Sequence, residues 1–358
     1  MKPAITVFIP YYNDENFIEK SIHSVLNSKF KDFELILLNH NSSDRSRSIA
    51  HSFSDSRIVH IDLEVNYSAG GGILFERALS CARGKYFKPF CADDLMSPEC
   101  LGNLYEYMES QPSIDFAFAG VKHINSQGKI IHIPKFKNLS SMEALRELVN
   151  ERNFLCYPAA IIKTNLLKKT IIDNSYILLF DLSLWVSMLV ANYNIGFLEN
   201  TYIYYRIHEG QISKSSPDIA RLYEMEIKSF WRLFLNINNL ETVKYLWPTS
   251  TLVSQLRDSK DIPFVVSREL LVSRRFQGNS FVYIHDLLMN SKNAVLLKEK
   301  FGYDIKSFRN DMLSFTICCR GKDFKHYVYN TPSKYLDFKS LTYLLFRRLL
   351  MKIKSGLK

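Results

Sequence analysis

Short apolar runs alternate with helical patterns along the first 120 residues of the chain. Between these runs, apolar residues recur at three- and four-residue spacing, for example at Phe17, Ile22 and Val25. Such spacing predicts amphipathic helices, whereas a short uninterrupted apolar run predicts a buried strand. The predicted strands cover residues 5–9, 35–38, 58–61, 86–91 and 116–119. Strands that alternate with helices predict an α/β fold with a doubly wound, mostly parallel sheet and helices on both faces.

Individual residues mark the ends of these predicted elements. We expect Pro10 to close the first strand, because proline cannot donate a hydrogen bond to a neighbouring strand. Ser43 or Asp44 is suited to capping the helix that follows the second strand. Gly84 is expected to end the helix around Leu74.

The pattern changes beyond residue 120. A hairpin is predicted near residues 123–133, and helices are predicted near residues 142–149 and 182–190. After about residue 212 the sequence is mainly helical in pattern and poor in glycine. The predicted domains are an α/β part, residues 1–213 with halves 1–120 and 121–213, and a helical C-terminal region, residues 214–358.

Composition narrows the class of protein. The chain has 358 residues, more than one typical domain, and its 47% hydrophobic content suits a globular core. Its six cysteines show no spacing typical of a metal site or a disulfide framework, so we interpret them as reduced thiols. The first apolar run is too short for a signal peptide or a membrane span. These features predict a cytoplasmic protein that is soluble or peripheral on the inner face of the membrane.

The formal net charge of +10 predicts a polyanionic partner. No zinc-finger, recognition-helix or RNA-recognition signature accompanies the basic residues, so nucleic acid is not expected as a partner. The charges condense in the apolar stretch 338–354, which holds Arg347, Arg348, Lys352 and Lys354. This stretch is either a helix docked on the rest of the protein or an interfacial helix on an anionic membrane surface.

Polar residues follow three of the predicted strands. Tyr12 comes after the first strand, Asn39 and His40 come after the second, and Asp93 and Asp94 come after the fourth. In sheets of this kind ligands bind at the carboxyl ends of the strands, so we expect these residues to line one crevice. Adjacent carboxylates repel each other unless a cation intervenes, and oxygen ligands suit Mg²⁺ or Mn²⁺. The alternative is that Asp94 only favours the N-terminus of the next helix.

Three segments resemble family 2 glycosyltransferases, in that family's order and spacing. Residues 5–44 hold a strand that ends in PYYN, a helix with SIHSVL and a second strand that ends in NHNSSD. Residues 81–101 read CARGKYFKPFCADDLMSPECL, and residues 181–213 contain DLSLW followed by YRIHEGQIS. The resemblance covers residues 4–213, and it implies a GT-A fold and inverting transfer of a sugar from a nucleotide sugar.

The resemblance also implies roles for individual residues. Tyr12 and the backbone near Pro10 would line the base pocket, while Asp93 and Asp94 would hold the metal, Mn²⁺ or Mg²⁺, and the ribose-diphosphate. Asp181 falls on the position of the family's catalytic base. An inverting transfer needs one carboxylate that removes the acceptor proton as the hydroxyl attacks the anomeric carbon. The alternative is that Asp181 merely caps the helix that follows it.

Further candidates come from two other segments. The family pattern places His208 near the diphosphate as a metal or phosphate ligand, although a histidine can also be a surface hydrogen-bond partner. Arg206, two residues earlier, is a candidate phosphate ligand. Arg77 and Glu76, which follow the glycine run, are candidates for contact with the donor sugar or the metal.

The sequence departs from the family pattern at three positions. Asn39 and His40 stand where acids are usual, which leaves the preference for uridine open, although an asparagine amide can still pair with a base edge. Cys91 stands where a first acid is common, and we interpret it as a buried thiol. The segment NYSAGGGI, residues 66–73, is similar to a stretch of rhamnosyl- and galactofuranosyltransferases.

Together these features predict a metal-dependent transferase. It would move a hexose or N-acetylhexosamine from a nucleotide-diphosphate sugar, with UDP-sugar favoured, to a hydroxyl of a glycan or lipid-linked glycan in bacterial-type surface polysaccharide synthesis. The alternative donors are dTDP-rhamnose or another deoxysugar. A nucleotidyltransferase would need a glycine-rich loop that the segment IPYYNDENF lacks. A catalytically inactive nucleotide- or glycan-binding module is the alternative from another class.

Overall fold

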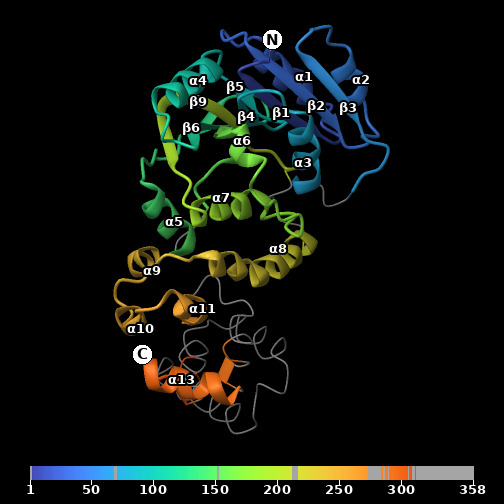
Figure 1. Cartoon of the computed structure of the whole chain (residues 1–358). Coiled ribbons are helices and arrows are strands. Elements are labelled where there is room, and N and C mark those ends of the chain that lie inside the picture. Colours follow the sequence, from blue (N-terminus) through green and yellow to red (C-terminus); the bar gives the residue numbers. More distant parts are fainter. Residues whose placement is uncertain are drawn as a thin grey trace, which may run out of the picture. The chain divides into compact units, whose positions relative to one another are not determined.

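The computed structural model divides into two compact units, Met1–Glu226 and Ile227–Lys358 (Figure 1). It describes residues 2–67, 71–150, 153–211, 217–272, 284, 287–288, 290–304, 306–308 and 311. Gly70 of the glycine run and the basic stretch 338–354 lie outside these residues. The expectation of an interfacial helix in that stretch therefore stays a prediction.

The first unit is built on a sheet whose strands follow the order β3-β2-β1-β4-β8-β6-β9-β5, with β7 paired to β6 (Figure 1). The strands are β1 Ile5–Tyr11, β2 Phe33–Asn39, β3 Ile58–Asp62, β4 Tyr86–Pro89, β5 Leu95–Met96, β6 Phe116–Ile124, β7 Ile130–His132, β8 Ala160–Lys163 and β9 Ile195–Arg206. Strands β1 to β4 pair in parallel, and so do β6 and β9. The pairs β4–β8, β6–β8, β6–β7 and β5–β9 are antiparallel. The predicted α/β class with a mostly parallel sheet is confirmed.

Helices connect these strands. In the first unit they are α1 Ile18–Leu26, α2 Ser46–His51, α3 Gly71–Cys81, α4 Cys100–Ser110, α5 Ser141–Asn150, α6 Thr164–Leu167 and α7 Phe180–Val190. Helix α8 spans Pro217–Phe230, and the second unit holds α9 Leu240–Leu246, α10 Thr251–Gln255, α11 Ile262–Val272 and α13 Ser291–Phe301. Short 3₁₀ turns cover Tyr157–Ala159, Trp231–Asn236 and Ser259–Asp261. The described part of the C-terminal region is helical, as its sequence predicts.

The central strands are buried on both faces, which is why they read as unbroken apolar runs. All seven residues of β2 are buried, and one of them is the charged Glu34. Its carboxylate accepts hydrogen bonds from the Thr6 hydroxyl at 2.6 Å and from Nε of Arg83 at 2.6 Å. These contacts compensate the buried charge, and they connect β1, β2 and the segment that follows α3.

Pro10 does not close the first strand, because β1 continues to Tyr11 and Pro10 pairs in register with Leu38 of β2. The pairing of β1 with β4 stops at Phe8 and Pro89. The missing N–H of Pro10 therefore leaves no hydrogen bond of that ladder unmade. The strand predicted at residues 86–91 is also shorter than expected. It ends at Pro89, where the chain leaves the sheet.

Gly84 does not end helix α3, which stops at Cys81. A side chain on Gly84 would overlap the backbone nitrogen of Thr6 in β1. The backbone N–H of Gly84 donates to the Thr6 hydroxyl at 2.9 Å. The glycine is therefore needed because the backbone packs closely against β1. It is not needed to end a helix in the left-handed conformation.

The second unit has helix ends with side-chain caps. Asn239, Ser250 and Asn290 accept hydrogen bonds from the first turns of α9, α10 and α13. Gly302, with a φ of 61°, ends α13 in the left-handed conformation. Among the described residues of both units, we find no helix that is long and apolar enough to cross a membrane.

Candidate active site

The segment after β4 carries two adjacent acids, and we call residues 91–94 the acidic turn. Asp94 is fully buried, and its Oδ1 accepts a hydrogen bond from the backbone N–H of Arg206 at 2.7 Å. Its Oδ2 is also buried and has no hydrogen-bond partner among the described residues. Burial, together with the charge of Asp93, holds the pKa of the Asp94 carboxyl well above its usual range. A buried carboxylate with one unpartnered oxygen needs either a proton or a cation.

His208 completes this end of the site. Its Nε2 lies 3.1 Å from Oδ2 of Asp93, although the two residues belong to different strand ends. The ring of His208 also packs on Phe17 with ring centres 4.7 Å apart. The structure therefore brings together the three residues predicted as metal ligands: Asp93, Asp94 and His208.

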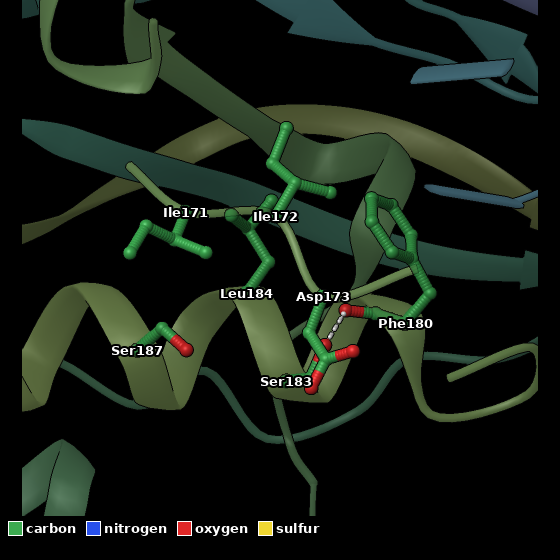
Figure 2. A pocket seen from close by; sticks show the side chains of 7 residues that line it. All are labelled: Ile171, Ile172, Asp173, Phe180, Ser183, Leu184 and Ser187. Atoms are coloured by element: carbon green, nitrogen blue, oxygen red, sulfur yellow. Dashed lines mark hydrogen bonds between the residues drawn. The ribbon is translucent and has the colours of Figure 1, made fainter. Parts of the chain in front are cut away.

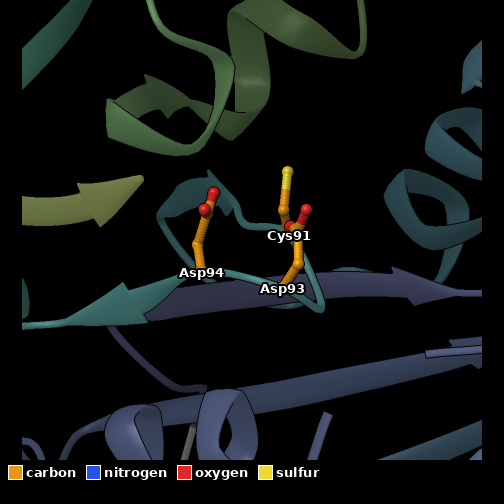
Figure 3. A group of neighbouring side chains, drawn as sticks. All are labelled: Cys91, Asp93 and Asp94. Carbon is orange, nitrogen blue, oxygen red and sulfur yellow. The ribbon is translucent and has the colours of Figure 1, made fainter. Parts of the chain in front are cut away.

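The donor chemistry of the acidic turn fits a hard divalent cation. One ligand atom from each of Cys91, Asp93 and Asp94 lies within 4.8 Å of the others, and Figure 3 shows the three side chains rising from one loop. Burial raises the pKa of the Cys91 thiol well above its ordinary value, so it stays protonated and is a poor ligand. The carboxylates and the neighbouring imidazole remain, which suits Mg²⁺ or Mn²⁺.

Lys88 is a buried cation beside these acids that the sequence analysis did not single out. Its ammonium group donates to the carbonyl oxygens of Pro89, at 3.1 Å, and Pro158. Burial lowers the pKa of Lys88 to about 8, while its positive charge lowers the pKa of Asp94. Lys88 therefore offsets part of the negative charge under the acidic turn.

Asp14 is a second residue that the sequence analysis missed. Burial, helped by the charges of Asp93 and Asp44, raises the pKa of its carboxyl to about 6, against the lowering effect of a hydrogen bond from the Tyr12 N–H. The Tyr12 N–H lies 3.0 Å from Oδ2 of Asp14. The only available signal was its place in the first strand-end turn, since no motif in the sequence analysis assigns it a role.

The first two strand-end turns are joined by hydrogen bonds. Asn13, with a φ of 55°, accepts the backbone N–H of Ser43 on its Oδ1 at 2.9 Å. The Asp14 N–H donates to the Ser46 hydroxyl at 2.7 Å. Asp44 accepts the N–H of Ser46 at 2.9 Å, in the turn that precedes α2. These bonds fix the turn that carries Tyr12.

Arg206 is placed differently from its predicted role. Its guanidinium donates to three backbone carbonyl oxygens, of Asp93 at 2.7 Å, Asn125 at 2.9 Å and Ser126 at 3.0 Å. The residue is only 1% exposed, and its guanidinium lies over the Phe17 ring. The geometry assigns Arg206 to holding the acidic turn in place, and it does not favour the predicted contact with phosphate.

Asn39 also has its side-chain amide engaged. Its Nδ2 donates to Oδ1 of Asp62 at 3.1 Å, and its Oδ1 accepts the N–H of Ser42 at 2.9 Å. Asp62 additionally accepts hydrogen bonds from Arg47 and His51. Because both ends of the Asn39 amide are used, the predicted pairing with a base edge would require this network to open.

Three aromatic side chains lie together at the ends of β1 and β2. His40 Nε2 accepts the backbone N–H of Tyr67 at 2.8 Å, and burial lowers the pKa of His40, so its ring is neutral. The ring of His40 lies 6.2 Å from that of Tyr12 and 6.0 Å from that of Tyr67. Tyr12 is 48% exposed. An exposed aromatic face held in this way can stack on a nucleobase, next to Pro10 in β1.

Asp181 is the second residue of α7 and is therefore inside the helix, while the N-cap position belongs to Leu179. The alternative of a simple N-cap is wrong. Its Oδ1 accepts the Leu182 N–H at 2.6 Å, and its Oδ2 accepts Nδ2 of Asn153 at 3.3 Å. Burial raises the pKa of Asp181 to about 6, against the lowering effect of these hydrogen bonds.

Asp181 and the acidic turn face the same intervening residue. The negative charges of Asp94 and Asp181 both raise the pKa of the Cys156 thiol, which burial already raises well above its ordinary value. The segment Tyr157–Ala159, which follows Cys156, also contacts β4, β6 and β9. The charges of two carboxylates from distant parts of the sequence therefore act on one buried thiol.

Glu226 of α8 supports the helix that carries Asp181. Its carboxylate accepts the backbone N–H groups of Ile177, Leu178 and Leu179, at 2.7 to 3.2 Å. These N–H groups precede the first turn of α7, where a negative charge also complements the helix dipole. Glu226 is only 5% exposed. No local pattern links it to α7, and only the folded chain shows this contact.

Arg77 and Glu76 lie exposed on α3. Glu76 accepts Nδ2 of Asn174 at 2.7 Å. Within the described part of the chain, no hydrogen bond or ion pair connects Arg77 to the acidic turn. A Cβ on Gly72 would overlap Oδ1 of Asn174, the end of a flexible side chain that can move aside, and would lie 3.3 Å from the Phe180 ring.

A small pocket lies apart from the acidic turn, on one side of α7. It is lined by Ile171, Ile172, Asp173, Phe180, Ser183, Leu184 and Ser187, with about 160 Å³ of space between atoms (Figure 2). The Ser183 hydroxyl donates to the Phe180 carbonyl at 2.7 Å. Asp173 is the one titratable residue in this lining, so the pocket offers no acid–base pair and no set of metal ligands.

Comparisons with known proteins show what the first unit is similar to. Residues 6–171 match the model of the family described as Glycosyl transferase family 2. An uncharacterized glycosyltransferase of Methanocaldococcus jannaschii is 28% identical over 64% of this chain and 80% of its own length. The putative teichuronic acid biosynthesis glycosyltransferase TuaG of Bacillus subtilis is 26% identical over 69% of this chain and 93% of its own.

One solved structure supports the fold. The S. aureus TarS fragment 1–349, in complex with UDP, superposes with a TM-score of 0.51 at 17% identity, over 88% of this chain and 90% of its own.

A further relative by sequence is the UDP-Glc:alpha-D-GlcNAc-diphosphoundecaprenol beta-1,3-glucosyltransferase WfaP of Escherichia coli. It is 24% identical over 58% of this chain and 79% of its own. The predicted resemblance to family 2 glycosyltransferases and the GT-A fold are confirmed.

Proposed function

We propose that this chain, whose residues 6–171 match the model of Glycosyl transferase family 2, is an inverting glycosyltransferase of bacterial-type surface polysaccharide synthesis. The donor would be a nucleotide-diphosphate sugar, with a UDP-linked hexose or N-acetylhexosamine favoured. The acceptor would be a hydroxyl of a glycan or lipid-linked glycan. The observation that carries this proposal is the buried acidic turn with its one unpartnered carboxylate oxygen, and a second carboxylate, Asp181, with a raised pKa supports it.

Asp93, Asp94 and His208 would hold a divalent cation, Mn²⁺ or Mg²⁺. Such a cation neutralises the charge that develops on the leaving diphosphate. The protein's own contribution is positional. Arg206 binds the backbone of the acidic turn, and Lys88 supplies a buried positive charge beneath it.

The role of general base falls to Asp181. With a pKa of about 6 its carboxylate is ionised at neutral pH, yet it is basic enough to accept a proton. It would take the proton of the acceptor hydroxyl while that oxygen forms a bond to the anomeric carbon. The bond from this carbon to the diphosphate oxygen breaks on the opposite face, so the configuration inverts. Asn153 and the Leu182 N–H would keep the carboxylate oriented.

The nucleoside would lie over the ends of β1 and β2. Tyr12 supplies an exposed aromatic face whose ring packs edge-on against His40, and Tyr67 stacks on His40. Pro10 and Asn39 lie on the same two strands, and we retain Arg77 as a candidate for the donor sugar. The proposed domains are 1–213 for catalysis and 214–358 for an accessory helical region.

The proposed place of action follows from the relatives' names. The name of TuaG assigns it, as putative, to teichuronic acid biosynthesis, and the name of WfaP gives a diphosphoundecaprenol-linked GlcNAc as its acceptor. We propose a cytoplasmic protein that is peripheral on the membrane, with the basic stretch 338–354 as one candidate contact. Nucleic acid is not proposed as a partner.

A donor screen tests the function directly. The full-length protein is incubated with UDP-, dTDP- and GDP-sugars, with and without Mn²⁺, and release of the nucleoside diphosphate is measured. We expect release from a UDP-hexose or UDP-N-acetylhexosamine that depends on the cation. Release only from dTDP-rhamnose would select the deoxysugar alternative. Binding without release from any donor, with acceptor glycans present, would indicate an inactive binding module.

A further inference from the structure

The β6–β7 hairpin carries an exposed surface that the proposed reaction does not use. We propose that this surface, residues 126–135, binds an anionic lipid bilayer directly beside the active site. We call these residues the hairpin surface. That the hairpin surface brings the active site to a lipid-linked acceptor rests on the proposed function. That it binds lipid does not.

The hairpin surface is apolar where solvent reaches it. Every residue from Ser126 to Ile133 is exposed. Ile130, Ile131 and Ile133 have 46%, 53% and 54% of their surface exposed. Strand β7 is short and pairs with β6, and Ile131 and Ile133 are two residues apart, so on an extended chain their side chains fall on the same side. Exposed isoleucines on one side of a hairpin mark a surface that associates with something apolar.

The charge of the hairpin points to an anionic partner. No acidic residue occurs between Asp115 and Glu143, and this stretch contains Lys122, Lys129, Lys135 and Lys137. Lys122 lies over the Tyr202 ring, and Lys137 pairs with Glu147. Lys129 and Lys135 are exposed on either side of the isoleucines. Apolar side chains flanked by cations are the combination that anionic lipid surfaces bind.

The same charges disfavour a second copy of this chain as the partner. Two hairpin surfaces packed against each other would place Lys129 and Lys135 of one copy near those of the other. Like charges at such a contact repel. A phospholipid headgroup layer instead supplies negative charge and an apolar interior together.

The hairpin is anchored at the acidic turn. Its turn residues Asn125 and Ser126 accept hydrogen bonds from the Arg206 guanidinium through their carbonyl oxygens. Asn125 Oδ1 also accepts the backbone N–H groups of Gln127, at 3.1 Å, and Lys129, at 2.9 Å, which stiffens the turn. The eight residues from Ser126 to Ile133 span at most roughly 27 Å of extended chain. A bilayer on this surface therefore lies close to the active site.

Vesicle binding of the full-length protein tests the proposal. The probes are vesicles of equal parts phosphatidylglycerol and phosphatidylcholine, and vesicles of phosphatidylcholine alone, with sedimentation as the measurement. We expect the wild type to bind the anionic vesicles. The variants I131D/I133D and K129E/K135E should each bind them about tenfold less, because they remove apolar contact or reverse local charge.

The matched control is Ile171→Asp, because Ile171 is 89% exposed on the loop between α6 and α7 of the same unit and is not part of the hairpin surface. We expect this variant to bind vesicles as the wild type does. Equal binding by I131D/I133D and the wild type overturns the proposal, and so does an equal loss with Ile171→Asp. A wild-type dimer that I131D/I133D dissociates, with vesicle binding unchanged, would show that a second copy covers the hairpin and would also overturn it.

Donor hydrolysis in the absence of vesicles separates this proposal from the proposed function. We expect all these variants to release nucleoside diphosphate at the wild-type rate in free solution. A wild type without donor hydrolysis, whose vesicle binding still depends on the hairpin, supports the lipid surface and contradicts the transferase. Donor hydrolysis by the wild type, together with vesicle binding that does not depend on the hairpin, would support the transferase and overturn the lipid surface.

Discussion

Nε2 of His208 lies 3.1 Å from Oδ2 of Asp93, although 115 residues separate them in the chain. Strand β9 ends at Arg206, whose backbone N–H binds Asp94, and two residues later His208 reaches Asp93. Both side chains are half-buried or more, with 15% and 22% of their surface exposed. One strand end therefore contacts both acids, and the predictions below follow from this arrangement.

Asp94→Asn should weaken binding of Mn²⁺. An asparagine oxygen can still accept the Arg206 N–H, so the change removes charge while the turn is held. We expect the affinity for Mn²⁺ to fall by more than the roughly 10- to 100-fold that follows from altering an outer partner of a metal ligand. The measurement is Mn²⁺ affinity together with cation-stimulated donor hydrolysis. Asp173→Asn is the control, and full wild-type activity in EDTA would contradict the role of the cation.

The same variant should be more stable than the wild type without metal. Burial raises the pKa of Asp94 above its unfolded value, so the ionised carboxylate destabilises the fold as the pH rises through that range. Asparagine removes this charge. We expect a higher unfolding temperature at pH 7 in metal-free buffer, measured by calorimetry. An unchanged or lower temperature would argue against an unpaired buried carboxylate.

Asp181→Asn should lower turnover by about 100-fold or more, the usual effect of losing a general base. The asparagine oxygen can keep the hydrogen bond from the Leu182 N–H, so helix α7 should be unaffected. Affinity for the nucleoside diphosphate should stay near the wild-type value. Steady-state turnover and calorimetric binding on the same variant check both expectations. Near-normal turnover would exclude Asp181 as the base, and lost nucleotide affinity would place it in the donor site.

Asn153→Ala should move the acidic limb of the pH–rate profile to higher pH. The pKa of Asp181 is about 6, and a base acts only when deprotonated, so wild-type turnover should be lost as the pH falls through about 6. The Asn153 amide donates to the charged carboxylate and lowers its pKa, so its removal raises the pKa further. Asn138→Ala, an exposed change, is the control. A limb that stays in place would mean that Asp181 does not set it.

Glu226→Ala should impair both stability and turnover. The change leaves the N–H groups of Ile177, Leu178 and Leu179 without their acceptor, which should cost about 1–3 kcal/mol in the free energy of unfolding. Because α7 carries Asp181, turnover should fall while nucleotide affinity is kept. Glu226→Gln retains one acceptor oxygen and should recover part of both effects. Glu199→Ala is the exposed control, and a Glu226→Ala protein with normal turnover would refute the positioning role.

The sequence alone determined the layout of the first unit. Buried strands and amphipathic helices leave a periodic signal within a few residues of each other, so local pattern identifies them. The same reasoning placed Asp93, Asp94 and Tyr12 at strand ends, because parallel strands bring their carboxyl ends to one edge. Strand β5, with two residues, gave too short a signal to be found, and the four residues of β8 were missed as well.

Only the tertiary structure decided which polar groups are available for ligands. The Arg206 guanidinium is consumed by backbone carbonyls, and the Asn39 amide by Asp62 and Ser42. Glu226 supports α7 from 47 to 49 residues away in sequence. Hydrogen bonds and burial depend on groups that the fold brings together, and the pKa of a carboxyl depends on its solvation. Neither the hydrogen bonds nor the pKa values can be read from a residue's immediate neighbours in the sequence. The sequence therefore predicted the type of chemistry, and the packing decided which groups are available for it.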